Sequence, residues 1–399
     1  HNPGTPKICR WREIGGGAMI EKDVVIIGGG STGLATAYYL SELGLKDLAL
    51  LEKDYVGSGS TGRCGTGIRA QFANEATITT MKRAEGLWKQ LATDLGFEFR
   101  QTGYLYLHYS DQALNKYRGI KTLQNSLGVP TEILSPADAK SLCNPLDVSK
   151  VKGASYNPQD GKAHPFEVVA GFRNYLQSGS ADLKEGTEVT GISLKKGGKV
   201  KIVQTTNEEY KTEILVNAAG GWAARVGEMM DLDIPIKPFR HQAIITEPIR
   251  SETIEPVIIS MKHEEAYLTQ TERGGVIGGV STPEDEPPTY ETRETLEFQK
   301  RVSRAFSSII PGLKRARILR QWGGYYAMSP DANPLLGEFG PPGHYVAVGF
   351  SGHGYMMSPA VGLGLAELIY RGKTDLPLEF YDPERIERGE LRESDLQMG

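Results

Sequence analysis

The sequence predicts an α/β fold, or α+β for the chain as a whole, because a strand–helix–strand unit stands near its start. Residues 23–28 (DVVIIG) form a short apolar run rich in β-branched side chains, which is typical of a buried strand. Residues 33–43 have helical spacing, and residues 47–52 (DLALLE) form a second buried strand. The whole unit has about 30 residues, the length of a right-handed βαβ crossover.

The turn between the first strand and the helix reads GGGSTG (residues 28–33) and has the spacing GxGxxG. Gly28 permits a tight turn, Gly30 lets the backbone approach a pyrophosphate, and Gly33 lets the helix pack closely on the strand. The phosphates would then lie on the free N–H groups at the start of the helix. Glu52 ends the second strand about 20 residues beyond Gly33, where a ribose diol needs an acceptor. The pattern predicts a Rossmann-like domain for FAD or NAD, and the acid disfavours NADP.

The rest of the chain continues the alternation of helices and strands. Helices are expected at residues 74–95, 111–127, 136–142, 166–178, 292–307 and 358–370. Strands are expected at residues 103–108, 188–194, 200–205, 209–211, 214–217, 241–246, 267–270 and 345–350.

Composition excludes several classes of protein. The 399 residues carry a net charge of −4 without a basic block, so neither nucleic acid nor a membrane surface is an expected partner. No apolar run approaches the roughly 20 residues of a membrane span. The three cysteines have no metal-ligand spacing, so no metal is expected, and their small number suits a reducing, cytoplasmic location. Met19 directly precedes the first strand, so residues 1–18 are expected to be a tag or an N-terminal extension.

Three further segments favour FAD over NAD. Residues 58–69 are rich in small side chains and contain Arg63 and Arg69, as expected where backbone must approach a flat ring. Residues 214–222 (ILVNAAGGW) are a strand that ends in small residues, and residues 348–357 (VGFSGHGYMM) lead from a strand into a helix. The N–H groups at the start of that helix would stabilise negative charge on a reduced flavin. The residues expected to contact FAD are Gly28, Gly30, Ser31, Thr32, Gly33, Glu52, Lys53, Ser60, Thr61, Arg63, Gly65, Thr66, Gly67, Val189, Ala219, Gly220, Trp222, Gly324, Gly352, His353, Gly354, Tyr355 and Met356.

With these motifs the chain resembles the superfamily of D-amino-acid oxidase and sarcosine oxidase, from Met19 to about Tyr381. The resemblance rests on the glycine fingerprint, NAAGGW, GFSGHG and the run WGGYYAMSPDANPLLGE (residues 322–338). Within the superfamily the chain looks most like the β subunits of dye-linked L-proline dehydrogenases and related sarcosine oxidase β-like proteins.

The resemblance implies a discontinuous FAD-binding domain interleaved with a substrate domain built on an antiparallel sheet. The FAD-binding domain would comprise residues 19–100, 156–236 and 322–385, and the substrate domain residues 101–155 and 237–321, followed by a charged tail at residues 386–399. It also implies non-covalent FAD, because relatives that tether the flavin use a cysteine shortly before the Ser/Thr-Pro-Asp turn, where this chain has Gly324.

The expected function is the oxidation of a small, secondary amino acid such as L-proline to its imine, by hydride transfer to flavin N5. Arg69 is expected to bind the substrate carboxylate, because its planar fork suits bidentate pairing. Tyr267, Tyr326 and His241 are candidates for the pocket wall, although each residue type is common in ordinary packing. Met356 stands where monomeric sarcosine oxidases have a lysine, which disfavours sarcosine itself. Electrons would pass to a partner subunit or a dye-like acceptor.

Three alternatives stay open on the sequence alone. The chain could be a sarcosine- or glycine-type oxidase that uses oxygen and produces peroxide. It could be an NAD-dependent dehydrogenase, which the colour of oxidised flavin would exclude. It could also be a flavin-carrying subunit whose main role is assembly with partners.

Overall fold

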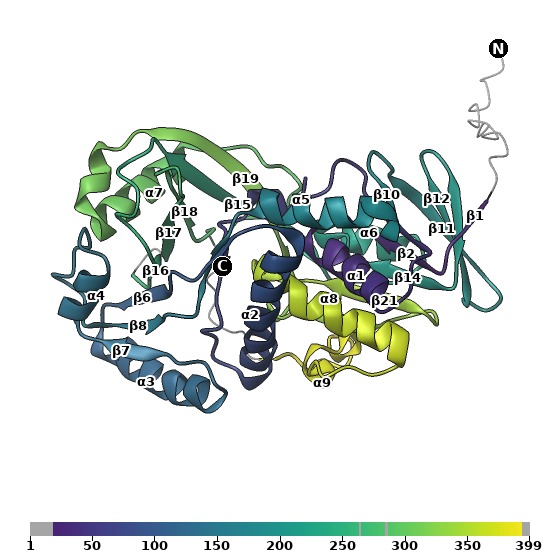
Figure 1. Cartoon of the computed structure of the whole chain (residues 1–399), viewed down its shortest axis with the longest axis horizontal. Coiled ribbons are helices and arrows are strands. Elements are labelled where there is room, and N and C mark those ends of the chain that lie inside the picture. The colour runs from purple at the N-terminus through teal and green to yellow at the C-terminus, as the bar shows by residue number, and fades with distance from the viewer. Residues whose placement is uncertain (1–18, 263–264, 284–285, 393–399) are drawn as a thin grey trace, which may run out of the picture.

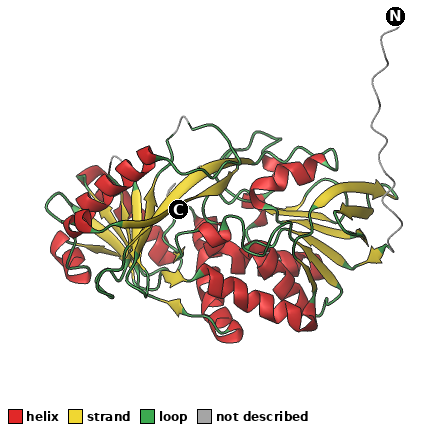
Figure 2. Cartoon of the chain, turned by 90° about the horizontal axis from the view of Figure 1, so that it is seen from above, coloured by secondary structure: helices red, strands yellow, loops and turns green. Residues whose placement is uncertain are grey.

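The computed structural model describes residues 19–262, 265–283 and 286–392, so the predicted extension at residues 1–18 and the end of the predicted tail lie outside it. Two sheets form the two halves of the molecule (Figure 1). Figure 2 shows strands gathered toward both ends of the long axis, with a group of helices between them. The predicted α/β fold is confirmed. None of the described helices has the length and apolarity required to cross a membrane.

The first sheet contains the N-terminal strand–helix–strand unit. It has six strands, all parallel to their neighbours except the last, in the order β10 (Asp182–Lys184), β3 (Leu48–Leu51), β2 (Val24–Ile27), β14 (Ile214–Asn217), β21 (His344–Val348) and β20 (Leu335–Glu338). Its inner strands β2 and β3 are buried along their whole length, as expected of a parallel sheet covered on both faces.

Alternate side chains of β2 enter two different cores. Val24 and Ile26 pack against the helical layer, whereas Val25 and Ile27 pack against the opposite layer. The helical layer consists of α1 (Ser31–Glu42), α2 (Glu75–Leu95), α5 (Pro165–Tyr175) and α8 (Gly354–Arg371). The opposite layer is a four-stranded sheet of β1 (Ile20–Glu21), β13 (Glu209–Thr212), β12 (Val200–Thr205) and β11 (Val189–Lys195).

The second large sheet has eight strands, all antiparallel to their neighbours except the pair β16–β6. Their order is β19 (Ile318–Met328), β15 (Lys237–Thr246), β18 (Val276–Val280), β17 (Ala266–Gln270), β16 (Val257–Ser260), β6 (Tyr104–His108), β8 (Gly153–Asn157) and β7 (Glu132–Leu134). One core of this half lies under α7 (Leu296–Ile309), and α3 (Asp111–Ser126) and α4 (Pro136–Leu142) also belong to this half. The boundaries predicted at residues 155/156 and 321/322 fall inside β8 and β19, so both strands belong whole to the eight-stranded sheet.

Two predicted helix starts were wrong. Helix α7 starts at Leu296 instead of residue 292, and the Thr295 side chain caps it by accepting from Phe298 N (3.3 Å). Helix α8 starts at Gly354 instead of residue 358, and continues through Pro359. Pro359 has no N–H to donate to the Tyr355 carbonyl four residues earlier. Ser358 Oγ donates to that carbonyl instead (2.8 Å), so the helix tolerates the proline.

The long strand β19 escaped the sequence analysis because its WGGYY segment contains two consecutive glycines, which weaken a strand. Gly323 is required by close packing, since a Cβ there would lie 2.4 Å from the Thr292 carbonyl oxygen. β19 lies at the edge of the eight-stranded sheet, and its later residues run beside the first half of the molecule. This strand therefore links the two halves at the site described next.

Candidate functional site

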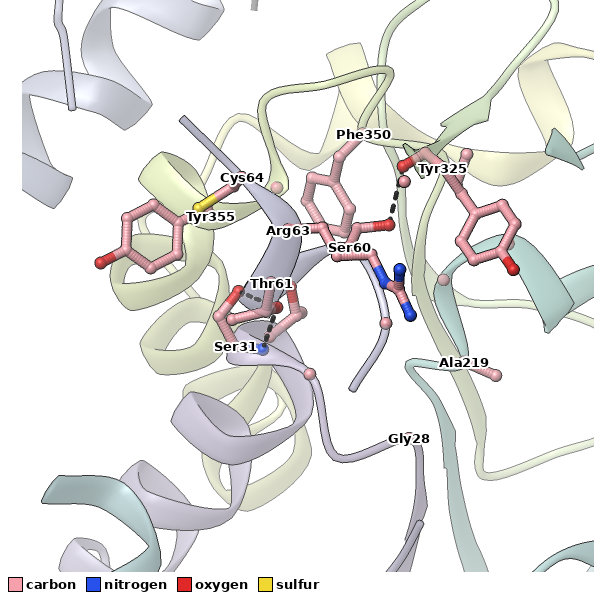
Figure 3. A pocket seen from close by; sticks show the side chains of 18 of the residues that line it. Gly28, Ser31, Ser60, Thr61, Arg63, Cys64, Ala219, Tyr325, Phe350 and Tyr355 are labelled. Atoms are coloured by element: carbon pink, nitrogen blue, oxygen red, sulfur yellow. Dashed lines mark hydrogen bonds between the residues drawn. The ribbon is translucent and has the colours of Figure 1, made fainter. Parts of the chain in front are cut away.

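A cavity of about 360 Å³ runs between the two halves, from the glycine turn after β2 to the tyrosines of the eight-stranded sheet (Figure 3). Most of the residues predicted for the site line it. These are Gly28, Gly30, Ser31, Thr32, Glu52, Lys53, Ser60, Thr61, Arg63, Gly65, Thr66, Gly67, Val189, Ala219, Gly220, Trp222, His241, Tyr267, Gly324, Tyr326, Gly352, Gly354, Tyr355 and Met356. Gly33, Arg69 and His353 lie behind the wall instead of on it.

The glycine turn at one end of the cavity fits a dinucleotide. Gly28 has φ +111°, and a Cβ there would lie 2.4 Å from the Ala218 carbonyl oxygen. A Cβ on Gly33 would lie 2.0 Å from the Gly28 carbonyl oxygen, so both positions need glycine for the protein's own packing. Gly30 differs, because its Cβ would meet only Thr61 Oγ1, at 3.4 Å. The open space over Gly30 is a cradle that a side chain would fill, as expected where a pyrophosphate lies.

Glu52 stands beside this turn with its carboxylate held by backbone groups. Its Oε2 accepts from Gly29 N (2.8 Å) and its Oε1 accepts from Asp54 N (2.9 Å), and only 9% of the residue is exposed. A carboxylate has about four acceptor sites, and Ser58 Oγ also donates to Oε1 (3.5 Å), so one site on Oε2 remains for a ribose hydroxyl. Lys53 and Trp222 line the same end, with Lys53 Nζ 3.6 Å from the centroid of the indole ring.

The loop at residues 58–67 is tied both to helix α1 and to strand β19. Thr61 Oγ1 accepts from Ser31 N (3.0 Å), so this N–H of the helix start is already used within the protein (Figure 3). Ser60 Oγ donates to Tyr325 O (2.7 Å), and Arg63 Nη1 donates to Gly323 O (2.9 Å). Arg63 therefore holds the loop against β19. Gly324 is the residue expected in place of a flavin-tethering cysteine. Packing also favours glycine at this position, because a Cβ on Gly324 would lie 3.2 Å from Arg63 Cβ.

The start of α8 closes the cavity from another side. Ser351 (φ +51°) and Gly352 (φ +100°) form the turn before it, and Ser351 N donates to Ala327 O of β19 (3.0 Å). A Cβ on Gly352 would lie 2.8 Å from the Tyr326 ring, so glycine is needed for this ring to cover the turn. The N–H groups in the first turn of an α-helix have no partner within the helix. Gly354, Tyr355 and Met356 place this helix start at the cavity wall.

Aromatic side chains of the eight-stranded sheet form the other end of the cavity. The rings of His241 and Tyr326 are stacked at 4.2 Å with an angle of 11° between their planes, and Tyr267 lies beyond His241 at 6.1 Å. Tyr104, Ala243 and Ile259 complete this wall. The sequence did not indicate that Tyr104 belongs to the site. In the strand YLYLH, the alternating pattern is the same for a tyrosine of a binding site and for a tyrosine of the core.

The hydrogen bonds of His241 determine which ring nitrogen carries the proton. Thr282 Oγ1 donates to Arg240 O (3.0 Å), which uses its single hydrogen. His241 Nδ1, 3.1 Å from that hydroxyl, must therefore donate to it. Nε2 is then a lone-pair acceptor, and this buried atom has no partner among the described residues. Burial, with a smaller contribution from the Arg301 charge, lowers the pKa of His241 to about 4, so the ring is neutral near pH 7.

Arg69 is a buried cation whose guanidinium is only partly used. Only 1% of the residue is exposed, its Nη2 lies 3.1 Å from His353 Nε2, and its Cζ lies 4.5 Å from the centroid of the Phe72 ring. Its Nε and Nη1 have no hydrogen-bond partner within the described part of the chain. Burial raises the pKa of the Tyr104 and Tyr326 hydroxyls, and the nearby Arg69 charge partly offsets that rise. Arg69 thus lies directly behind two tyrosines of the cavity wall.

A buried ion pair that the sequence did not predict holds the SPDANP turn, which lies against the turn before α8. Arg385, fully buried near the C-terminus, donates through Nε and Nη2 to both carboxylate oxygens of Asp331 (2.9 and 2.8 Å). Asp331 belongs to the SPDANP turn, whose Ser329 N lies 3.4 Å from Ser351 Oγ of the turn before α8. No periodicity connects positions so far apart in the sequence.

The chain has close relatives of known family and structure. A family model described as FAD dependent oxidoreductase matches residues 23–368. The sarcosine oxidase subunit beta of Rhodobacter capsulatus is 30% identical over 365 residues, which are 90% of this chain and 87% of that protein. The crystal structure of L-proline dehydrogenase from P. horikoshii is 47% identical, with a TM-score of 0.91 over 94% of this chain and 100% of that chain. Glycine oxidase from Geobacillus kaustophilus, 22% identical, shares the fold with a TM-score of 0.83 over 92% of this chain and 99% of that chain.

Proposed function

The chain belongs to the DAO family of FAD-dependent oxidoreductases, and from this premise we propose that it oxidises a small secondary amino acid, with L-proline as the first candidate. The single observation that carries the proposal is a pair of polar groups that have no partner among the described residues, one on the aromatic wall of the cavity and one directly behind it. His241 Nε2 is a buried acceptor, and Arg69 Nε and Nη1 are buried donors on a cation. An amino acid supplies the complement of both, an amine N–H and a carboxylate.

The residues of the aromatic end have distinct tasks in this proposal. Arg69 binds the carboxylate, since Nε and Nη1 of this buried cation have no hydrogen-bond partner among the described residues and suit a charged acceptor. His241 accepts a hydrogen bond from the amine and so orients the carbon that bears the nitrogen. Bound FAD supplies the acceptor for a hydride from that carbon. The tyrosine rings exclude water from the reacting end and offer an apolar wall to a pyrrolidine ring.

The glycine turn, Glu52 and the start of α8 would hold FAD without a covalent bond. Burial raises the pKa of the Cys64 thiol, the cysteine that lines the cavity, to about 12. A thiol that stays protonated is a poor nucleophile, which supports a flavin that heat or acid releases.

Two relatives support the choice of substrate and the state of assembly. L-proline dehydrogenase from P. horikoshii is 47% identical over its whole chain, which supports L-proline as the substrate. Met356, which lines the pocket, is uncharged and so does not add a cation for the substrate carboxylate. Sarcosine is the second candidate, because a 30% identical relative is a sarcosine oxidase subunit. That relative is named as a subunit, so we propose that this chain also works within a complex of several subunits, which receives the electrons or passes them on.

Anaerobic titration of the FAD-loaded protein tests the substrate. We expect L-proline to bleach the flavin absorbance faster than sarcosine, and sarcosine faster than glycine. Reduction by glycine or D-amino acids alone would contradict the proposal. Reoxidation by an artificial dye but only slowly by oxygen would support a dehydrogenase, whereas fast peroxide formation would favour the oxidase alternative.

A further inference from the structure

We infer that His353 is a positioning residue that orients Arg69 for the substrate carboxylate and couples this anchor to the turn at the cofactor. The inference rests on the proposed function, because it assumes that Arg69 binds a carboxylate. It concerns the imidazole of His353, a residue that the sequence predicts as a contact of FAD.

The contact between the two side chains has one possible polarity. A guanidinium has five N–H donors and no acceptor. His353 Nε2, 3.1 Å from Arg69 Nη2, must therefore hold a lone pair and accept. The imidazole is thus neutral in this arrangement, since a second proton would place two donors and two positive charges against each other.

Phe72 completes the support of the guanidinium. Its ring lies 4.5 Å from Arg69 Cζ and meets the His353 ring edge to face, at 5.2 Å between centroids. Phe72 is fully buried, so its position is set by the core. The guanidinium therefore rests on one ring and donates to another, while Nε and Nη1 keep their hydrogen-bonding capacity for a ligand.

His353 holds this contact from a backbone position that is itself fixed. It is the residue before the first turn of α8, its N–H donates to Phe350 O (2.9 Å), and its carbonyl accepts from Met357 N (3.1 Å). Its two neighbours Gly352 and Gly354 line the cavity. Any shift of this turn would move the arginine with it, so the carboxylate anchor and the cofactor turn keep a constant spacing.

The chemistry of imidazole suits this task better than that of the alternatives. A carboxylate at position 353 would pair with Arg69 and compete with the carboxylate of the substrate. A lysine or arginine would repel the guanidinium. A neutral acceptor fixes the orientation of Arg69 and leaves its charge available.

Two dead-end ligands separate positioning from a merely structural role. L-Tetrahydro-2-furoate has the carboxylate of proline but no amine, and pyrrolidine has the amine but no carboxylate. We expect His353→Leu in the FAD-loaded protein to weaken binding of the furoate about tenfold, as loss of a hydrogen bond to a charged group predicts. Binding of pyrrolidine should stay within about twofold, and His353→Gln, whose amide oxygen is an acceptor, should recover most of the furoate affinity. Isothermal titration calorimetry measures all three.

Equal weakening of both ligands, an unchanged furoate affinity, or failure of His353→Gln to restore it would overturn the inference. If His353→Leu does not retain FAD, Phe72→Leu decides instead, because it removes the supporting ring and leaves the turn intact. If Phe72→Leu weakens binding of the furoate selectively, the positioning of Arg69 by His353 and Phe72 is supported. If the furoate affinity is unchanged in Phe72→Leu, this positioning is rejected. A furoate affinity that Arg69→Ala leaves unaltered would show that the proposed function of Arg69 has failed, and would overturn the inference for that separate reason.

Discussion

The two ends of the cavity are built in different ways. The end beside β2 is made of backbone, and its glycines at positions 28 and 33 are required because a Cβ would strike carbonyl oxygens at 2.4 and 2.0 Å. The aromatic end is made of side chains from strands of the eight-stranded sheet, such as Tyr104 of β6, His241 of β15 and Tyr326 of β19. A backbone site depends on a short local pattern, whereas a side-chain site depends on strands that meet only in the folded sheet.

The largest expected effect separates two glycines of one turn. Gly30→Val should keep the fold and lose FAD, because its Cβ meets only Thr61 Oγ1 within the protein but would occupy the space of the pyrophosphate. We expect the affinity for FAD to fall by more than about a hundredfold, since no packing can relieve the overlap. Fluorescence titration of the apoprotein measures it.

Gly33→Ala is the matched control for that comparison. Its Cβ would lie 2.0 Å from the Gly28 carbonyl oxygen, so this variant should also lower the melting temperature of the apoprotein. A Gly30→Val protein that retains one FAD per chain would disprove the placement of the pyrophosphate.

Arg69→Ala should act on the opposite end of the cavity. Truncation of one partner of a buried charge pair costs about 2–5 kcal/mol, so affinity for L-proline should fall at least tenfold while FAD stays bound. Steady-state kinetics and flavin content measured on the same preparation check both parts. Arg63→Lys is the control, because Arg63 holds the loop to β19 and its change should disturb FAD more than substrate. Unchanged kinetics in Arg69→Ala would remove this residue from the site.

His241→Phe should remove the acceptor for the amine and preserve the stack on Tyr326. We expect about tenfold weaker binding of pyrrolidine, from the loss of a hydrogen bond to a charged or polar amine, and little change for tetrahydro-2-furoate. His241→Gln places an acceptor near the position of Nε2 and should recover part of the affinity. The reverse selectivity, with only the furoate affected, would exchange the roles given to His241 and Arg69.

A further expected effect is a pH dependence of stability. Burial lowers the pKa of His108, His241 and His344 to about 4, whereas histidines of an unfolded chain titrate near about 6.5. Between these values the unfolded chain binds protons that the folded chain does not, so the free energy of unfolding falls as the pH falls from 6.5 to 4. Guanidinium unfolding at about pH 7 and about pH 5 measures the slope.

His108 and His241 belong to the eight-stranded sheet, and His344 to the six-stranded sheet. Double substitution of His108 and His241 by glutamine should therefore reduce the pH slope more than His344→Gln does. Equal slopes in all variants would assign the pH dependence to carboxylates instead.

The sequence by itself determined the backbone-built part of this protein. The strand at residues 23–28, the glycine spacing and Glu52 lie within about 30 residues, and their periodicity and turn chemistry act locally. The same is true of α4, whose predicted bounds match the structure. The family resemblance and the FAD cofactor followed from such short motifs and are confirmed by the matches to known relatives.

Tertiary structure alone decided the rest. The two glycines in β19 argue against a strand, yet pairing with β15 along its whole length overrides this weak local preference. The ion pair of Arg385 joins segments about 50 residues apart, and the contact of Arg69 with the His353 imidazole joins segments about 280 residues apart. No local pattern connects such positions, nor does one place Tyr104 at the site. The charge state of His241 follows from one hydroxyl of Thr282 and from burial. The Thr282 contact and the burial of His241 exist only in the folded protein, because hydrogen-bond geometry and desolvation are properties of packed atoms and not of residue order.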